Sequence, residues 1–438
     1  MKTAMQPIST TDSPCEPRQL PPAPHTVEDT GLDLLFLVEL LAKILFLHGR
    51  MSIAAISCHV KLPNSVLEPV FAFMRQERLC EMTSRGEGSA SIFFQLSETG
   101  RNRAREYLQR SHYAGPAPVT LDAYCAQVES QMLGEVHYTR ESVTRVFDRI
   151  VVQDAILDQL GAAMNSGRSI FIYGPAGSGK TFIAEMLVNL LPDNICVPYA
   201  IAVDDEVIQI YDPLIHHVTE QETCTANLLE RKDTADIRWQ LCKRPVAISG
   251  GELTLNTLDL EFDKTTRYYQ APPHVKANNG IYIVDDLGHQ SITPRELMNR
   301  WIVPLDRRRD YLTLHTGYKF RIPFDVKVIF SSNMTPENLA DDAFLRRLGY
   351  KIYFGAMSED QYCTIFRHVC EELSIPFSKA AFKHLLHERH YKEGKPLLAC
   401  YPRDLLNQVK DLAMYERRPA TLTNEALDWA WQNYFATL

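Results

Sequence analysis

The residues best suited to chemistry lie in a glycine-rich stretch with the spacing G-x-x-x-x-G-K-T. In order they are Gly174, Pro175, Ala176, Gly177, Ser178, Gly179, Lys180 and Thr181. Glycines let successive backbone N–H groups turn toward a polyphosphate, and a helix that begins here adds its partial positive charge. We expect Lys180 to reach the β- and γ-phosphates of ATP and the Thr181 hydroxyl to ligate Mg²⁺.

Two carboxylates that could complete such a site follow the apolar run at residues 280–284. We expect Asp285 to hold the Mg²⁺, and Asp286 to orient and deprotonate the attacking water. A second apolar run, residues 326–332, ends at Asn333, whose polar side chain could hold the same water. The pattern predicts hydrolysis of the bound triphosphate.

Cationic side chains follow at two further positions. Arg346 and Arg347 lie at the end of one predicted helix, and Arg403 lies in the first turn of another. Arginines of this kind can stabilise the charge that develops on a transferring phosphoryl group.

These residues need secondary structure to position them. Residues 169–173 are apolar and β-prone, whereas the stretch from Phe182 to Leu191 has helical spacing without proline or glycine. The glycine-rich stretch therefore lies between a strand and a helix, which is the context that a phosphate-binding loop requires. The apolar runs before Asp285 and Asn333 predict further buried strands.

The N-terminal part of the chain predicts a small separate domain. Residues 1–28 are rich in Pro, Ser and Thr, without periodicity, and predict a disordered tail. Residues 29–112 predict three helices, a β-hairpin and a final helix, which resembles a winged helix-turn-helix domain. The third helix has no basic residue in its N-terminal half, so we expect protein docking, with DNA binding as the alternative. Residues 113–138 predict a linker.

Taken together, the motifs resemble the AAA+ ATPase family over about residues 145–438. The resemblance implies an α/β fold: a P-loop core with a parallel sheet over residues 139–356 and a C-terminal helical lid over residues 357–438. Mg²⁺ and ATP would be its cofactors. It implies that Asn333 is sensor 1, that Arg403 is sensor 2, and that Arg347, with Arg346 as the alternative, is the arginine finger. The further residues that it places at the nucleotide are Ile150, Val151 and Phe182.

The resemblance also implies an assembly and a task. Because a finger of this kind reaches the γ-phosphate bound by a neighbouring subunit, we expect a ring, and specifically a hexamer, that remodels a protein client. One departure is Asp286, where most members of the family have Glu. The Asp side chain is shorter by one methylene, about 1.5 Å, so a nucleotide-gated scaffold with slow turnover is an alternative. An ATP-switched DNA-binding regulator is another.

Two segments narrow the sub-family. Residues 311–322 alternate around a glycine-containing turn and predict a hairpin before the strand that ends at Asn333. Residues 246–275 resemble a helix-2 insert. Together they resemble the clade that holds MoxR-type chaperone ATPases, and a link to bacterial secretion or pilus systems is one hypothesis.

Composition limits the remaining classes of protein. The 438 residues carry a formal net charge of −8 and are 45% hydrophobic, which argues against a protein that coats nucleic acid. The ten cysteines include no C-x-x-C pair, so we expect reduced thiols rather than disulfides or zinc. No apolar run reaches about 18 residues, so we expect no membrane span and a cytoplasmic protein.

Overall fold

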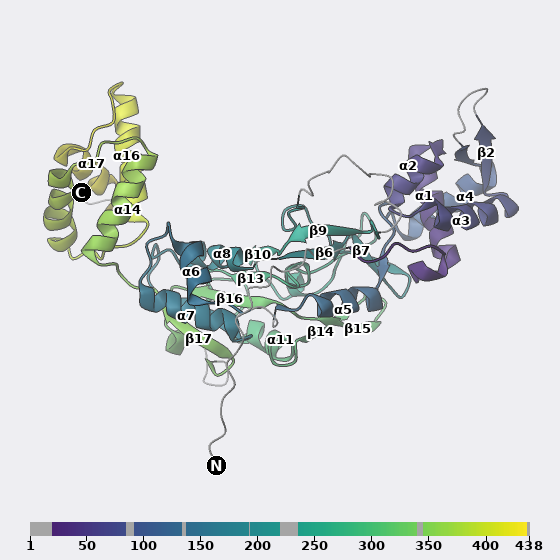
Figure 1. The fold of residues 1–438 in the computed structure, drawn as a ribbon, viewed down its shortest axis with the longest axis horizontal. Helices are drawn as coiled ribbons and strands as arrows, with labels where there is room; N and C mark the ends of the chain where they lie inside the picture. The colour runs from purple at the N-terminus through teal and green to yellow at the C-terminus, as the bar shows by residue number, and fades with distance from the viewer. Residues whose placement is uncertain are drawn as a thin grey trace, which may run out of the picture. The chain divides into compact units, whose positions relative to one another are not determined.

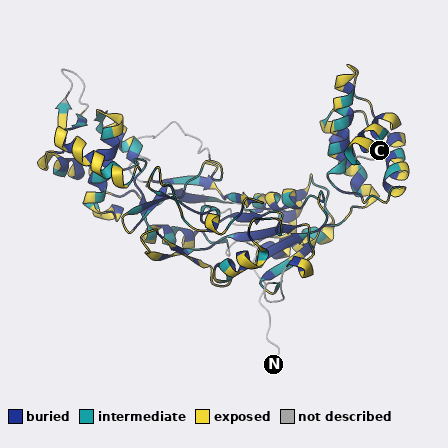
Figure 2. Ribbon diagram, turned by 180° about the vertical axis from the view of Figure 1, so that it is seen from behind, coloured by how far each residue is buried: buried dark blue, intermediate teal, exposed yellow. Residues whose placement is uncertain are grey.

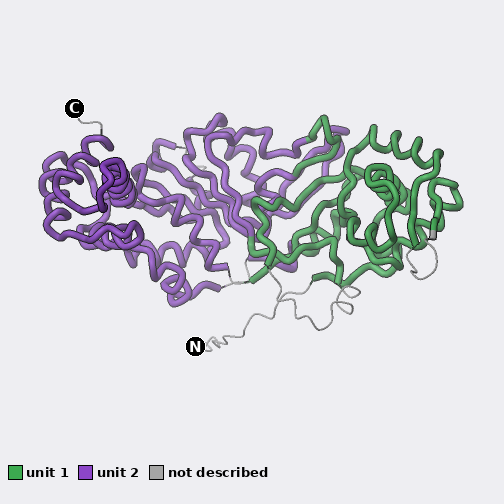
Figure 3. Tube along the Cα trace, turned by 90° about the horizontal axis from the view of Figure 1, so that it is seen from above, with its two compact units in different colours: residues 1–127, 192–244, 262–270 green, residues 128–191, 245–261, 271–438 purple. Residues whose placement is uncertain are grey.

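The computed structural model describes residues 20–84, 92–133, 137–191, 193–219, 235–339 and 345–435 (Figure 1). Buried residues gather on the strands and on one side of most helices (Figure 2). The chain forms two compact units, each built from several segments of sequence (Figure 3). Unit 1 comprises Met1–Gln127, Pro192–Arg244 and Phe262–Gln270, and unit 2 comprises Val128–Leu191, Pro245–Glu261 and Ala271–Leu438.

The first part of unit 1 contains the four helices and two strands that the sequence predicts there, together with two short elements that it does not predict, η1 and β1. They are η1 (Glu28–Thr30), α1 (Leu34–His48), β1 (Met51–Ser52), α2 (Ile53–Val60), α3 (Asn64–Gln76), β2 (Cys80–Ser84), β3 (Ile92–Leu96) and α4 (Glu98–Arg110). The side chains of Asp33, Ser52 and Ser97 cap α1, α2 and α4 by accepting backbone N–H bonds. The strands pair antiparallel in the order β1-β3-β2. The predicted turn between β2 and β3 lies outside the described residues.

The rest of unit 1 is a β structure that no motif predicts. Its elements are β4 (Val119–Thr120), α5 (Leu121–Ser130), β6 (Asn194–Pro198), β7 (Ala200–Val203), β8 (Glu206–Gln209), β9 (Trp239–Lys243), β11 (Glu261–Phe262) and β12 (Tyr269–Gln270). One sheet has the order β11-β12-β8-β7-β4, and β6 pairs antiparallel with β9 in a separate two-stranded sheet. The α5 helix and β11 each cross a boundary between the units.

The predicted N-terminal domain shares its core with this β structure. The buried cluster formed by its helices also contains Ala200 of β7 and Val207 of β8, and Tyr268 packs against the cluster. Asp236 and Arg238 form a buried ion pair of 2.8 Å, and Arg238 also donates to two backbone carbonyls earlier in the unit. These contacts tie the later segments of unit 1 to its first part.

The unit boundaries therefore differ from those expected from the sequence. Residues 192–244 and 262–270 lie within the predicted nucleotide-binding domain, 139–356, but group with the N-terminal segment. The predicted linker, 113–138, carries β4 and α5. In the predicted disordered tail, residues 20–28 are described, and the carbonyl of Pro21 accepts from the backbone N–H of Asp236 at 2.7 Å. The boundaries differ because short strands pair with strands that are far away in the sequence. A local sequence pattern does not indicate such pairing.

Unit 2 contains a five-stranded parallel sheet with the order β10-β13-β16-β5-β17. Its strands are β5 (Ser169–Tyr173), β10 (Val246–Ser249), β13 (Ile281–Val284), β16 (Lys327–Ser332) and β17 (Leu348–Tyr353). The other elements of this part are α6 (Arg140–Phe147), α7 (Asp154–Asn165), α8 (Lys180–Met186), η3 (Leu187–Leu190), η4 (Asn256–Leu258), α10 (Pro273–Lys276), α11 (Pro294–Arg307), β14 (Arg309–Thr313), β15 (Lys319–Pro323) and α12 (Pro336–Leu339). Every residue of β13 and β16 is buried, as expected for strands covered on both faces. The predicted α/β fold with a parallel P-loop core is confirmed.

The structure of unit 2 bears on the predictions made for residues 311–322 and 246–275. The hairpin predicted at 311–322 is present as the antiparallel pair β14 and β15. The helix-2 insert predicted at 246–275 is not confirmed: this segment begins with the edge strand β10 and contains no α-helix before Pro273. Its first residues pair in parallel with β13, and that pairing fixes them as a strand of the central sheet.

The C-terminal region is helical, as predicted. It consists of α14 (Glu359–Glu372), α15 (Lys379–His384), the π-helix η5 (Leu385–Tyr391), α16 (Tyr401–Tyr415) and α17 (Asn424–Phe435). Tyr362, Phe366, Leu405 and Trp431 form the centre of its own buried cluster. Within the described part of the chain, each helix is too short or too polar to span a bilayer.

Candidate active site

The glycine-rich loop joins β5 to α8. Gly174, Gly177 and Gly179 have φ angles of 150°, 81° and 90°, which residues with a Cβ rarely adopt. A Cβ on Gly174 would lie 1.9 Å from the carbonyl oxygen of Phe354, and one on Gly177 would lie 2.4 Å from Sγ of Cys400. The loop therefore needs glycine for its conformation and also for the close approach of the surrounding chain.

Lys180 links this loop to the end of a neighbouring strand. Its Nζ donates to the carbonyl oxygens of Gly174 and Pro175, both at 3.0 Å, and to Oδ1 of Asn333 at 2.8 Å. Burial lowers the pKa of Lys180, and two nearby carboxylates act in the opposite direction. The ammonium group thus lies at the point where an anionic ligand could replace its present oxygen partners.

Thr181 and Asp285 form the part of the site that fits a divalent cation. The hydroxyl oxygen of Thr181 lies 2.9 Å from each carboxylate oxygen of Asp285. Asp285 follows β13, and its backbone N–H donates to the carbonyl of Ser249 at 2.8 Å, which fixes it at the carboxyl end of the sheet. Mg²⁺ prefers such hard oxygen ligands, together with phosphate oxygens and water.

Asp286 and Asn333 face each other at the ends of β13 and β16. Nδ2 of Asn333 donates to Oδ1 of Asp286 at 3.0 Å. Asp286 has a left-handed φ of 51°, so the chain turns sharply after β13. Because β16 lies between β13 and β5, the carboxyl ends of these three strands are adjacent, which is where α/β sheets usually bind ligands.

These side chains open onto one cavity of about 750 Å³, a size typical of small-molecule sites. The residues predicted for the site that line it are Ile150, Val151, Ala176, Gly177, Ser178, Gly179, Lys180, Thr181, Phe182, Asp285, Asp286, Asn333 and Arg403. Gly174 and Pro175 contribute their carbonyls behind this lining. The buried hydroxyl of Ser178 has no hydrogen-bond partner among the described residues, which fits a loop shaped for a further polar ligand.

The helical C-terminal region forms one side of the cavity. The backbone N–H of Cys400 donates to the carbonyl of Gly177 at 3.1 Å, so the start of α16 contacts the loop. Arg403 lines the cavity but forms a bidentate pair with Glu372 of α14, with distances of 3.0 Å (Nη1–Oε1) and 2.7 Å (Nη2–Oε2). The guanidinium of Arg403 is therefore held on the side of the helical region.

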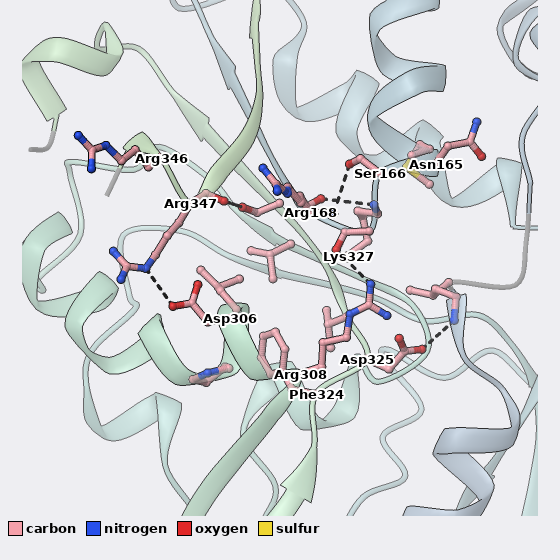
Figure 4. A pocket seen from close by; sticks show the side chains of 18 of the residues that line it. Asn165, Ser166, Arg168, Asp306, Arg308, Phe324, Asp325, Lys327, Arg346 and Arg347 are labelled. Atoms are coloured by element: carbon pink, nitrogen blue, oxygen red, sulfur yellow. Dashed lines mark hydrogen bonds and ion pairs between the residues drawn. The ribbon is translucent and has the colours of Figure 1, made fainter. Parts of the chain in front are cut away.

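Arg346 and Arg347 lie elsewhere in unit 2. They precede β17, at the amino end of a strand whose carboxyl end lies beside the glycine-rich loop. Nε of Arg347 lies 3.3 Å from Oδ2 of Asp306, and both arginines line a second cavity (Figure 4). The structure thus brings the loop, Asp285, Asp286, Asn333 and Arg403 together, and places the two candidate finger residues apart from them.

Glu372 and Cys400 are among the lining residues of this site that sequence reasoning misses. Glu372 stands in no motif, and it meets Arg403 only because α14 packs beside α16. A signal exists for Cys400, because it immediately precedes the Tyr401-Pro402-Arg403 start of a predicted helix, where contacts with the nucleotide loop are expected if Arg403 reaches it.

Comparison with known proteins gives the following findings. A family model described as a domain of unknown function (DUF8689) matches residues 358–433. No curated protein sequence matches the chain. NtrX from Brucella abortus in complex with ADP is similar in structure at 12% identity and a TM-score of 0.39, over 65% of this chain and 52% of that one. The RuvB Holliday junction branch migration motor of Thermotoga maritima is similar at 9% identity and a TM-score of 0.39, over 65% of this chain and 70% of that one.

This chain therefore spans about half the length of NtrX. At these levels of similarity neither structure assigns a function to it.

Proposed function

We propose that this chain is an ATPase of the AAA+ type, which binds Mg-ATP at the ends of β5, β13 and β16. The observation that carries the proposal is the convergence of three contacts: Lys180 with Asn333 at 2.8 Å, Thr181 with Asp285 at 2.9 Å, and Asn333 with Asp286 at 3.0 Å. A glycine-rich turn that matched the motif by chance would not bring these partners from adjacent strands onto one cavity.

Each side chain has a defined part in the proposal. Lys180 exchanges its oxygen partners for phosphate oxygens, and Thr181 with Asp285 holds Mg²⁺, which supplies positive charge to the phosphates. Asn333 positions the attacking water, and the carboxylate of Asp286 accepts its proton. Arg403 leaves Glu372 to meet the phosphates and so couples nucleotide to the helical region. Because this chemistry depends on positioning and electrostatics, the loss of one charge should slow it strongly.

The second part of the proposal is that Arg347 acts in trans. Its position before the amino end of β17 separates it from the cavity of its own chain, and this position supports a role at the site of a neighbouring copy. A head-to-tail contact between identical copies forms a ring when its rotation closes, and we propose a closed ring of six subunits. Arg346 is the alternative finger.

The task that we propose is remodelling of a protein client, with unit 1 as a docking module. The alternative, a DNA-binding regulator, has one observation in its favour, the exposed arginines of α4. Two of them are already partnered: Arg101 lies 3.7 Å from Glu98, and Arg103 lies 3.1 Å from Glu106. A surface that tracks phosphates needs several free cations. The MoxR-type relationship stays a hypothesis, since the segment expected to be a helix-2 insert is not confirmed as one and begins with β10.

The first experiment measures ATPase rate against protein concentration, beside mass photometry with and without ATP, for the wild type and Arg347→Ala. We expect a rate per subunit that rises with assembly and collapses in the variant while nucleotide still binds. A flat rate, or nucleotide binding without turnover, would instead favour the nucleotide-gated scaffold.

A second experiment tests the DNA-binding alternative. Binding to random-sequence duplex DNA is measured at increasing salt concentration. Binding that weakens steeply with salt would support the regulator, and its absence at about 50 mM salt would exclude it.

A further inference from the structure

A second cavity, of about 550 Å³, lies in unit 2 at the amino ends of β5, β16 and β17 (Figure 4). The nucleotide-binding loop follows the opposite, carboxyl end of β5, so the two cavities are distinct. The walls of the second cavity come from the turn before β5, the end of α11, the start of β16 and the segment before β17. Apart from the candidate finger residues and the first residues of the run 326–332, none of these segments belongs to the motifs that define the proposed ATPase site.

The charges around this cavity are unbalanced. Its cationic lining residues are Arg168, Arg308, Lys327, Arg346 and Arg347, and its carboxylates are Asp306 and Asp325. Both carboxylates are engaged: Asp306 pairs with Arg347 at 3.3 Å, and Asp325 accepts from Nδ2 of Asn279 at 2.8 Å and the backbone N–H of Leu133 at 2.9 Å. The two donors to Asp325 are neutral, so its charge still acts on Lys327. The five cations of the lining therefore outnumber its two carboxylates by three.

Arg308 shows this imbalance most clearly. No described carboxylate lies within ion-pair distance of its guanidinium group, and its one hydrogen bond is a long contact of 3.5 Å from Nη2 to the carbonyl of Gly167. Arg168 also has no ion-pair partner among the described residues. Figure 4 shows Arg308 near Lys327 and Arg347 directed toward Asp306, while the side chain of Arg168 lies against Gly349 of β17.

Lys327 provides a buried charge beneath these arginines. The residue is 5% exposed, and its Nζ donates to the carbonyls of Ala163 at 3.2 Å and Arg168 at 3.3 Å. Burial, with the charge of Arg308 acting in the same direction, lowers the pKa of Lys327 to about 8, although Asp325 opposes this. An ammonium has three donors, so one remains beyond these two carbonyls. Buried lysines are rare unless paired, and an anion in the cavity would pair this one.

We propose that this cavity is a second phosphate-binding site, in which Lys327 forms the floor and Arg308 and Arg168 form the rim. A point charge beside planar guanidinium groups matches a phosphoryl group, which accepts several charge-assisted hydrogen bonds at once. The phosphate has two sources that share this chemistry: a free phosphate compound, or the nucleotide of an adjacent copy. Only the second source rests on the ring proposed above.

The site is joined to the candidate finger. Oγ of Ser169, the first residue of β5, donates to the backbone carbonyl of Arg347 at 3.2 Å, and the side chain of Arg347 pairs with Asp306 on the same cavity. A phosphate bound here would compete with Asp306 for Arg347. Occupancy of the second cavity would therefore alter where this arginine points.

The test is calorimetric titration of the full chain with inorganic pyrophosphate in a Lys180→Ala background, which silences the first site. We expect one remaining site, which Arg308→Ala weakens by at least about tenfold, because a charge-assisted bond to phosphate is lost. Arg307→Ala is the matched control, since this exposed arginine is adjacent in α11 but does not line the cavity. Lys327→Met should weaken binding as well.

Two results would overturn the proposal. One is the loss of all pyrophosphate binding in Lys180→Ala, and the other is an equal weakening by Arg307→Ala and Arg308→Ala, which would indicate unspecific attraction. Because the readout is binding, an inactive ATPase does not affect it. Repeating the titration of the wild type after assembly with a non-hydrolysable ATP analogue separates the sources: a neighbour's nucleotide would block the second site, and a free compound would leave it open.

Discussion

Asp286 is the residue on which turnover depends in the proposed mechanism. Its carboxylate already accepts from Asn333 at 3.0 Å, so one oxygen remains for the water. We expect Asp286→Asn to lower kcat by about 10²-fold or more, because the base is lost. ATP affinity, measured by titration, should stay near that of the wild type. An Asn variant that hydrolyses ATP at the wild-type rate would show that Asp286 is not the base.

Glu372 restrains Arg403 before nucleotide arrives. The two side chains form a bidentate pair, but both are exposed, so their attraction is worth at most about 1 kcal/mol. We expect Glu372→Gln to tighten ATP binding by about twofold to fivefold, more than ADP binding, because Arg403 no longer has to leave a carboxylate. The double variant with Arg403→Ala should lose this gain. A gain that persists without Arg403 would contradict the restraint.

At this scale the sequence predicts most of the proposed site. Lys180, Asp285 and Asn333 each follow an apolar strand. Their residue types and their positions after these strands are enough to predict that they share one site. Glu372 is different, because its partner lies on another helix and the contact exists only once α14 packs beside α16. A contact between side chains on two different helices has no characteristic spacing in the sequence, so it could not be predicted.

At the scale of elements, a buried polar network joins three segments of unit 2. His274 of α10 donates from Nε2 to Asp310 of β14 at 2.9 Å, and Arg300 of α11 contacts both oxygens of Asp310 at 2.7 and 2.9 Å. The network fixes the β14–β15 hairpin to the helices beside it. Removing the cation would leave a buried carboxylate with too few partners, which is costly.

This network should make stability depend on pH. Burial lowers the pKa of His274, and the pKa of buried His390 is lowered for the same reason. The unfolded chain then binds more protons than the folded chain as pH falls below about 6.5, so stability is present above that pH and is lost below it. We expect His274→Gln to flatten the loss between about pH 6.5 and 5 in denaturant unfolding. If the dependence of stability on pH is the same in His274→Gln as in the wild type, His274 is not its source.

We expect Arg300→Met to lower the free energy of unfolding by about 3 kcal/mol at neutral pH, because the buried carboxylate of Asp310 loses its cation.

Elements were predictable where their pattern is local. The strands β5, β13 and β16 are continuous apolar runs, and the β14–β15 hairpin alternates around a glycine turn. By contrast, β4 and β12 have two residues each, and they gain their structure by pairing with β7 and β8. The partners are far away in the chain, so neither the sheet of unit 1 nor its true boundaries could be inferred from sequence.

At the scale of the whole molecule, the N-terminal helices should depend on residues far along the chain. Asp236 neutralises the buried Arg238, which also donates to the carbonyls of Thr30 and Pro118. Asp236→Ala leaves that charge unpaired, and we expect a cost of about 3 kcal/mol together with faster hydrogen exchange in α1 and α3. Asp204→Asn, in an exposed turn, is the control. Unchanged exchange would mean that residues 29–112 are independent, as their sequence alone suggests.

The proposed assembly makes the most demanding prediction, because it assigns the halves of one site to two copies. Lys180→Ala abolishes the site but keeps the finger, and Arg347→Ala keeps the site but abolishes the finger. Each variant alone should be inactive. In an equimolar mixture that assembles at random, about a quarter of the head-to-tail interfaces would join an intact site to an intact finger, so about a quarter of the wild-type rate should return.

The dependence of that rate on mixing ratio decides between the alternatives. A maximum near equal amounts requires a finger in trans, and the same mixture made with Arg346→Ala in place of Arg347→Ala identifies which arginine acts. No recovery at any ratio, in mixtures that mass photometry shows to be mixed rings, would exclude action in trans, and wild-type activity of Arg347→Ala alone would place Arg347 outside catalysis. The pair with Asp306 would then be its structural role, and the second cavity would remain as the reason for an arginine at this position.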